Sequence, residues 1–276
     1  MNVDERKQAI LAKKDYKFDD LVEILRLLRG EGGCPWDREQ THQSIRKDLI
    51  EETYELVEGI DEDDPAMMRE ELGDVLLQVV FHSGISEDAG DFDIDDVCDD
   101  VCKKLIVRHP HVFGDVVAET SGEVLKNWDN IKKETKHQTT DTDVLRSISK
   151  ALPALMRAQK LGQKSRKWGF DFEDARAAAE KIPEETAEAM AAFERGDADA
   201  AEEEFGDLLL AVVNAARLAG VDAEKALYRA NEKYITRFEE VERLCRAEGK
   251  SVSETPFERK CELWDKAKEI LAEKAR

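Results

Sequence analysis

The sequence has few aromatic residues, and this scarcity argues against a protein built from sheets. Aromatic residues make up 7% of the chain, whereas charged residues make up 38%. Ala, Leu, Glu and Lys dominate over Val, Ile and Thr, and the dominant residues are the better helix formers. The composition therefore predicts an all-α protein with almost no sheet.

Basic residues are also few compared with acidic residues. The chain carries 42 Lys and Arg against 63 Asp and Glu, which gives a formal net charge of −21 and an isoelectric point near 4.8. Proteins that bind nucleic acid depend on basic surface to release counterions. The composition therefore argues against a nucleic-acid partner, and an anionic substrate would need metal ions between itself and the protein.

Two further features are missing, namely an apolar run near 18 residues and an amino-terminal signal pattern. The cysteines form an odd set without the spacing of a disulfide framework: Cys34, Cys98, Cys102, Cys245 and Cys261. These observations predict a cytoplasmic protein with reduced thiols and no membrane partner.

Acidic residues, by contrast, gather in two helical segments of the second half, "PEETAEAM" and "EEEFGDLL". The carboxylates concerned are Glu184, Glu185, Glu188, Glu204 and Asp207. Like charges three or four residues apart share a helix face and repel by about 0.2 to 0.5 kcal/mol per pair. A bound cation would reverse that sign, and Mg²⁺ prefers oxygen ligands. The five carboxylates are therefore candidate metal ligands.

The same pattern occurs in the first half, in "EETYEL" and "EELGDVLL". A shift of 133 residues carries each member of this set onto its counterpart: Glu51, Glu52, Glu55, Glu71 and Asp74. A single charged run on a helix is usually a solvated face. Duplication with identical offsets favours a second candidate metal site.

Cationic and aromatic residues recur in the same order after each acidic set. Lys and Arg stand four residues apart at Lys104 and Arg108 and again at Lys233 and Arg237. A Trp precedes a Lys by four residues in two pairs, Trp128 with Lys132 and Trp264 with Lys268. The first pattern suits a phosphate clamp, and the second offers a flat surface for a base. Together with carboxylate-held metal, they indicate a site for a nucleoside polyphosphate, attacked by metal-activated water.

The duplication also predicts the domain organisation. We expect tandem helical domains at residues 1–136 and 147–276, joined by a linker at 137–146 that includes most of the polar run "KHQTTDTD". A zinc site at Cys98, Cys102, His109 and His111 is disfavoured, because its spacing is unusual and the second half has no counterpart. A di-iron site is disfavoured because Glu-x-x-His pairs are missing from the acidic helices. His82 is interpreted as a satisfied core histidine.

Apolar residues indicate how the acidic helices of the first half should pack. A helix from about residue 41 to 60 carries one apolar stripe, formed by Ile45, Leu49, Leu56 and Ile60. A helix starting at Pro65 carries another, formed by Met68, Leu72, Val75, Leu76 and Val79. We expect both stripes, with the carboxylates beside them, to face the interior of a helical bundle.

Several segments together resemble one known family. They include "GCPWDREQTH", "EETYEL", "EELGDVLLQVVF", "RHPHVFGD", "GFDFED", "EEEFGDLLLA" and "ANEKYITRFEEVE", and they span about residues 18 to 270. On these motifs the chain resembles the MazG family of nucleoside triphosphate pyrophosphohydrolases, within the all-α NTP pyrophosphatase superfamily. The resemblance implies Mg²⁺-dependent cleavage between the α and β phosphates of NTP or dNTP, giving monophosphate and pyrophosphate. It also implies tandem four-helix-type domains in a homodimer.

The resemblance further implies that the second half is catalytic and the first half serves assembly. It makes Glu184, Glu185, Glu188, Glu204 and Asp207 the metal ligands, and it assigns to the nucleotide Lys181, Lys233, Arg237, Trp264 and Lys268. The first half has Asp48 where Lys181 would stand, and Pro183 departs from the pattern directly before the second acidic motif. The alternatives are a non-catalytic dimerisation or nucleotide-sensing module and a narrower hydrolase for dUTP or damaged nucleotides.

Overall fold

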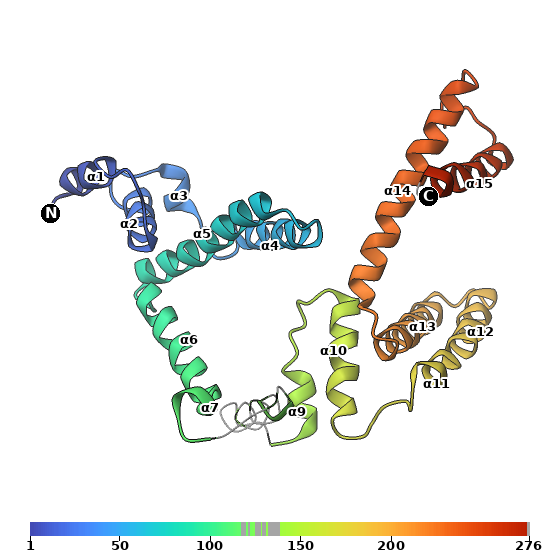
Figure 1. The fold of residues 1–276 in the computed structure, drawn as a ribbon, viewed down its shortest axis with the longest axis horizontal. Coiled ribbons are helices and arrows are strands. Elements are labelled where there is room, and N and C mark those ends of the chain that lie inside the picture. The colour runs from blue at the N-terminus through green and yellow to red at the C-terminus, as the bar shows by residue number, and fades with distance from the viewer. Residues whose placement is uncertain (117–119, 121, 125–127, 129–130, 132–138, 275–276) are drawn as a thin grey trace. The chain divides into compact units, whose positions relative to one another are not determined.

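The described part of the chain is mostly helical. The computed structural model describes every residue except 117–119, 121, 125–127, 129–130, 132–138 and 275–276, and the described residues contain no strand (Figure 1). The all-α prediction is therefore confirmed. No helix in these described ranges combines the length and the apolar character needed to cross a lipid bilayer.

Contacts divide the chain into two units, Met1–Lys132 and Lys133–Arg276. Of the predicted linker, residues 137 and 138 lie outside the described residues, and its second half forms helix α9, Asp141–Arg146. The domain boundaries drawn from the sequence stay a prediction.

The first unit is organised around its longest helix, α5, against which α2, α4 and α6 pack. Its helices are α1 (Val3–Leu11), α2 (Phe18–Arg29), α3 (Pro35–Glu39), α4 (Arg46–Asp61), α5 (Pro65–Ala89), α6 (Ile94–Arg108) and α7 (Pro110–Phe113). Its buried core comes from three of these helices and the residue before α4: Val22, Leu25, Ile45, Val80, Phe81 and Ile94.

A tight turn folds α4 back along α5, and we call this pair the first hairpin. The Asp64 carboxylate caps α5 by accepting from the amides of Ala66 at 2.9 Å and Met67 at 3.2 Å. Pro65 occupies the first helical turn, where its missing amide donor has no intrahelical acceptor to lose. Gly59 is buried against Met67, so a side chain there would crowd the hairpin. The local sequence thus dictates the antiparallel pairing that brings two acidic segments together.

The second unit repeats this hairpin with α12 and α13, and we call the pair the second hairpin. Its helices are α9, α10 (Ala154–Arg166), α11 (Ala175–Ala179), α12 (Lys181–Glu194), α13 (Ala198–Leu218), α14 (Ala223–Ala247) and α15 (Phe257–Lys274). Gly196 makes the turn with a φ of 70°, and the Asp197 side chain caps α13. Small buried residues let the two helices approach closely: Ala189, Ala192 and Ala211.

A buried ion pair fastens the segment before α11 to the second hairpin. The guanidinium of Arg217 donates to both carboxylate oxygens of Asp171, at 2.6 and 3.0 Å. The two side chains are 5% and 9% exposed. The Arg217 hydrogen bonds hold the pKa of Asp171 below its ordinary value. Gly162 on α10 gives Arg217 its space, since a Cβ there would stand 2.6 Å from Nε.

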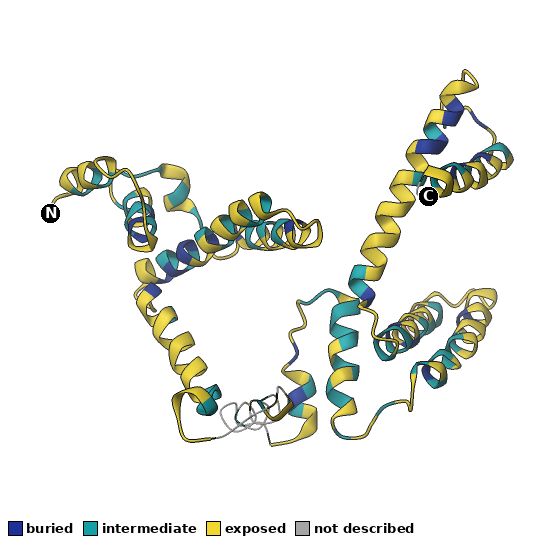
Figure 2. Ribbon diagram, in the orientation of Figure 1, coloured by how far each residue is buried: buried dark blue, intermediate teal, exposed yellow. Residues whose placement is uncertain are grey.

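The expected packing of the apolar stripes is wrong for several residues. Ile45 is buried, but Ile60, Leu72, Leu76 and Val79 are 52%, 53%, 39% and 39% exposed, and much of the surface of α4 and α5 is open (Figure 2). Among the described helices of the unit, α4 packs substantially only against α5.

The ion pair predicts a stability effect. Asp171→Ala should lower the free energy of unfolding by about 3 to 5 kcal/mol at pH 7, because Arg217 is left buried and unpaired. Since the folded-state pKa of Asp171 is depressed, the difference from wild type should shrink as the pH falls below its ordinary value of 3.8. Urea unfolding of this variant and of Glu173→Ala, an exposed neighbour, measures the effect. Equal losses in both variants would contradict the assignment.

Candidate metal and nucleotide site

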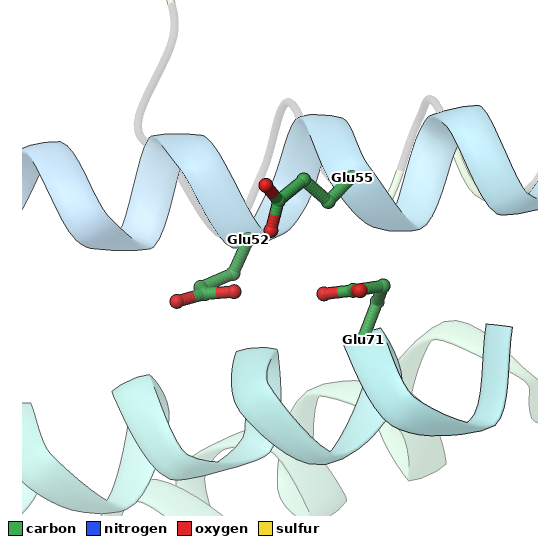
Figure 3. A group of neighbouring side chains, drawn as sticks. All are labelled: Glu52, Glu55 and Glu71. Carbon is green, nitrogen blue, oxygen red and sulfur yellow. The ribbon is translucent and has the colours of Figure 1, made fainter. Parts of the chain in front are cut away.

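Three carboxylates meet between the helices of the first hairpin. Glu52 and Glu55 lie on α4, Glu71 lies on α5, and one oxygen of each is within 4.8 Å of the others. Figure 3 shows the three side chains pointing into the space between the two helices. All three are half-buried. The arrangement gathers hard oxygen donors from two helices in a partly desolvated gap.

The electrostatics of this group is unfavourable without a cation. Burial raises the pKa of Glu52, and the neighbouring carboxylates raise it further, with Asp74 the largest of them and Glu51 the smallest. Burial and then Glu55 and Asp74 raise the pKa of Glu71. No Lys or Arg in the described part of the chain forms an ion pair with these three glutamates. Oxygen donors with uncompensated charge are the chemistry that fits Mg²⁺.

The second hairpin brings the equivalent carboxylates together. Glu185 and Glu188 on α12 and Glu204 on α13 each place an oxygen within 4.8 Å of the others. Burial raises the pKa of Glu204, followed by the charges of Glu188 and Asp207. Asp207 contributes charge to this group, as Asp74 does in the first hairpin, but neither aspartate is among the three carboxylates that meet within 4.8 Å.

A lysine distinguishes the second hairpin. Lys181 Nζ lies 2.7 Å from Glu184 Oε1 and 3.4 Å from Glu185 Oε1, and the Glu184 hydrogen bond raises the lysine's pKa. Glu184 is 55% exposed and stands outside the group of three. Pro183 is the third residue of α12, within the first turn where amides have no intrahelical acceptor. The proline therefore leaves Glu185 and Glu188 directed at α13.

The cationic and aromatic candidates form a separate group on α14 and α15. The Arg237 guanidinium lies 5.9 Å from the centre of the Trp264 ring, and Lys268 pairs with Asp265 at 2.7 Å. Lys233 is exposed. Among the described residues, none of these cations pairs with a carboxylate of the second hairpin. The structure thus gathers the acidic set in the second hairpin. It does not pair the cations of α14 and α15 with those carboxylates.

The first unit shows the same separation. Lys104 and Arg108 lie on α6, and Trp128 is 38% exposed with its ring 5.9 Å from that of His109. Lys132 lies outside the described residues.

Sequence reasoning missed two contacts between aromatic rings. The Tyr234 ring lies 5.0 Å from that of Trp264, a contact that its position three residues before Arg237 could have indicated. His42 and His82 approach Nδ1 to Nδ1 at 2.8 Å, and burial lowers the pKa of His82. The Nε2 of His82 is buried without a partner among described atoms, so the interpretation of a satisfied core histidine is wrong.

Comparison with known proteins identifies the family. The profile described as the MazG nucleotide pyrophosphohydrolase domain matches the chain twice, over residues 40–113 and 165–242. The chain belongs to the MazG family. Each match contains one acidic hairpin and the Lys and Arg that stand four residues apart on the helix after it. The recurrence noted in the sequence is therefore a tandem MazG domain.

Similar curated MazG-family proteins extend over nearly the whole chain. The nucleoside triphosphate pyrophosphohydrolase/pyrophosphatase MazG of Thermotoga maritima is 45% identical over 251 residues, covering 91% of this chain and 95% of that protein. The nucleoside triphosphate pyrophosphohydrolase of Escherichia coli K12 is 44% identical over 255 residues, covering 91% and 97%.

We predict that repulsion among the uncompensated carboxylates destabilises the first hairpin, and that this effect depends on pH. With EDTA present at pH 7, Glu52→Gln should raise the melting temperature by about one to three degrees, because it removes a charge that its neighbours repel. The folded-state pKa of Glu52 lies above its ordinary value of 4.5, so the folded state binds more protons. The advantage of the variant should therefore fade as the pH drops through that pKa.

Scanning calorimetry across this pH range measures the effect, and Glu58→Gln, an exposed glutamate on the same helix, is the control. If the wild-type protein is more stable than Glu52→Gln in EDTA at pH 7, the predicted destabilisation by charge repulsion is contradicted.

Proposed function

We propose that the chain is a Mg²⁺-dependent nucleoside triphosphate pyrophosphohydrolase, which cleaves NTP or dNTP between the α and β phosphates to monophosphate and pyrophosphate. The observation that carries this proposal is the convergence of Glu185, Glu188 and Glu204 within 4.8 Å across one hairpin. Membership of the MazG family and the names of the relatives support the reaction class.

The carboxylates of the second hairpin would hold Mg²⁺. Glu185, Glu188, Glu204 and Asp207 supply oxygen donors from two helices, and small rotations of long side chains suffice to match the ligand distances of about 2.0 to 2.1 Å that Mg²⁺ requires. When bound, the metal neutralises phosphate charge and acidifies a water molecule. A carboxylate of the group that is free of metal can accept the proton of the attacking water.

The cationic residues would bind the triphosphate. Lys181 already lies at the edge of the carboxylate group, so a phosphate oxygen can replace Glu184 as its partner. Lys233, Arg237 and Lys268 carry the charge that steadies the leaving pyrophosphate. Trp264 offers its ring to the base, and stacking accepts any base because each presents a π face. We therefore expect the site to accept nucleotides with different bases.

The second half is the better candidate for catalysis. Lys181 lies beside its carboxylates, whereas the first half has Asp48 at the matching position. The exchange makes the first hairpin more negative by two charges, which disfavours a triphosphate even where a metal ion binds. We further propose a homodimer, in which the exposed apolar faces of the hairpins are covered. The cytoplasmic location stays a prediction from the cysteine pattern.

Substitution in each hairpin tests which one turns over substrate. Glu185→Gln should lower kcat for pyrophosphate release by about 100-fold or more, since it removes a ligand whose charge offsets that of the metal. Glu52→Gln should leave most of the turnover. Glu202→Gln, an exposed glutamate on α13, controls for loss of charge. Unchanged release by Glu185→Gln would refute the assignment of the second hairpin.

A panel of NTPs and dNTPs, with Mg²⁺ or with EDTA, tests the reaction itself. Monophosphate and pyrophosphate should appear in equal amounts with Mg²⁺ and be absent with EDTA, whichever base is present. Phosphorus NMR separates pyrophosphate from orthophosphate and so reports the bond that breaks. Binding of Mg²⁺-NTP in calorimetry without any product would instead indicate a nucleotide-sensing module.

A further inference from the structure

A row of polar side chains continues along α5 from the carboxylates of the first hairpin. Asp74, Gln78 and His82 follow one another at intervals of four residues, and we call them the polar row. They share the face of the helix that carries Glu71, one of the three glutamates that meet between α4 and α5 (Figure 3). At about 1.5 Å per residue, His82 lies about 12 Å along the helix from Asp74. The hairpin therefore presents carboxylates and, farther along the same face, an amide and an imidazole.

Two atoms of the polar row are buried without a hydrogen-bond partner among the described residues. They are Oε1 of Gln78 and Nε2 of His82. The whole of Gln78 is 8% exposed. Burying a polar atom without a partner costs free energy. A ligand that supplied the missing partners would recover this free energy.

The ring of His82 is held in place from its other side. Its Nδ1 lies 2.8 Å from Nδ1 of His42, and Nε2 of His42 lies 3.3 Å from Oγ of Ser86. The two rings are nearly parallel, with 4° between their planes. A proton shared between the two Nδ1 atoms fixes the ring of His82, so Nε2 on the opposite side of the ring is left for another partner.

The second hairpin forms without these polar groups. The shift of 133 residues that relates the two acidic sets carries each of the three polar residues onto an alanine: Gln78 onto Ala211, His82 onto Ala215 and His42 onto Ala175. Ala211 is buried where α12 and α13 approach each other. A hairpin of this kind therefore packs with small apolar residues at these places, and helix packing alone does not account for the polar row.

The chemistry of the two ends of this face indicates the class of ligand. A metal ion on the carboxylates binds oxyanions, whereas Oε1 of Gln78 accepts a hydrogen bond from an N–H or O–H group. A ligand that reaches both ends carries an anion at one end and a polar edge at the other. A nucleotide has this form, with a phosphate and the hydrogen-bonding edge of a base.

Charge favours a monophosphate over a triphosphate in the first hairpin. Asp48 stands where the second hairpin has Lys181, and no Lys or Arg in the described part of the chain pairs with the three glutamates. Each additional phosphate brings negative charge that the metal alone must offset. A nucleoside monophosphate is therefore repelled least.

We propose that the first hairpin is a base-selective site for a nucleoside monophosphate, in which Mg²⁺ on the carboxylates holds the phosphate and Gln78 and His82 bind the edge of the base. This ligand belongs to the product class of the proposed reaction, but its binding does not depend on turnover by the second hairpin. A base that directs an N–H group at Gln78 binds more tightly than one that directs an acceptor there, because the acceptor leaves a buried oxygen unpaired.

Calorimetry on a chain with an inactivated second hairpin tests the proposal. The full chain carries Glu185→Gln, Glu188→Gln and Glu204→Gln, and it is titrated with AMP, GMP, CMP and UMP, each with Mg²⁺ or with EDTA. Binding is expected with Mg²⁺ and not with EDTA. The best base should bind at least about 10-fold more tightly than the worst, since a mismatched edge leaves buried polar atoms unpaired. Absence of binding, or equal affinities for all four, would overturn the proposal.

Two substitutions in this chain separate the ends of the site. Gln78→Leu should weaken the preferred monophosphate by about 10-fold or more and should reduce the differences among bases. Glu52→Gln should weaken all four monophosphates by a similar factor, because it damages only the end that holds the metal. Gln8→Leu, at an exposed glutamine of α1, is the matched control and should change neither the affinity nor the order of the bases.

Unfolding without nucleotide distinguishes binding from packing. Gln78→Leu removes a buried oxygen that has no partner, so its melting temperature in EDTA should equal or exceed that of the parent chain. A lower melting temperature with unchanged nucleotide affinity would overturn the proposal, as would tighter binding of triphosphates than of monophosphates. Pyrophosphate release by the wild-type chain is measured separately, so failure of the proposed function and failure of this site are distinguishable.

Discussion

Repulsion among half-buried carboxylates is the constraint on which the rest of this structure depends. Each hairpin directs glutamates from two helices into one gap, where partial desolvation raises the pKa of Glu52, Glu71 and Glu204. A fold that places like charges in this way loses stability unless a cation binds. The short capped turn at Asp64 and the tight turn at Gly196 hold the helices antiparallel nonetheless. The helix packing therefore offsets the cost of keeping these carboxylates together.

The two hairpins differ in how much of this repulsion the chain itself relieves. In the second hairpin, Lys181 pairs with Glu184 and Glu185, so part of the charge is compensated before any ion binds. In the first, Asp48 occupies the matching position and adds to the charge. A bound metal ion should consequently stabilise the first hairpin more than the second. A polyanionic substrate should be repelled less by the second hairpin than by the first. Both hairpins thus keep the carboxylates, but a lysine accompanies them in the second and an aspartate in the first.

Much of this could be predicted from the sequence, because helical periodicity decides which residues share a face. The group of Glu185, Glu188 and Glu204 follows from spacings of three residues and a hairpin turn. The displacement of Glu184 towards Lys181 could not be predicted, since a long side chain chooses between neighbours by local geometry. The exposure of Leu72 and Leu76 was unpredictable for another reason. An apolar stripe indicates that a face is covered, but not which chain covers it.

That distinction matters for the energetics of the site. A partner that covered the stripes would contribute to association at about 25 cal/mol per Å² of apolar surface removed from water. Metal and nucleotide would favour one another in the proposed site, because a cation relieves the repulsion among the carboxylates and lowers the cost of placing a polyanion beside them. By linkage, nucleotide would strengthen metal binding by the same free energy. The repulsion within the hairpin would make this coupling large, since a cation gains more at uncompensated carboxylates than at a neutral surface.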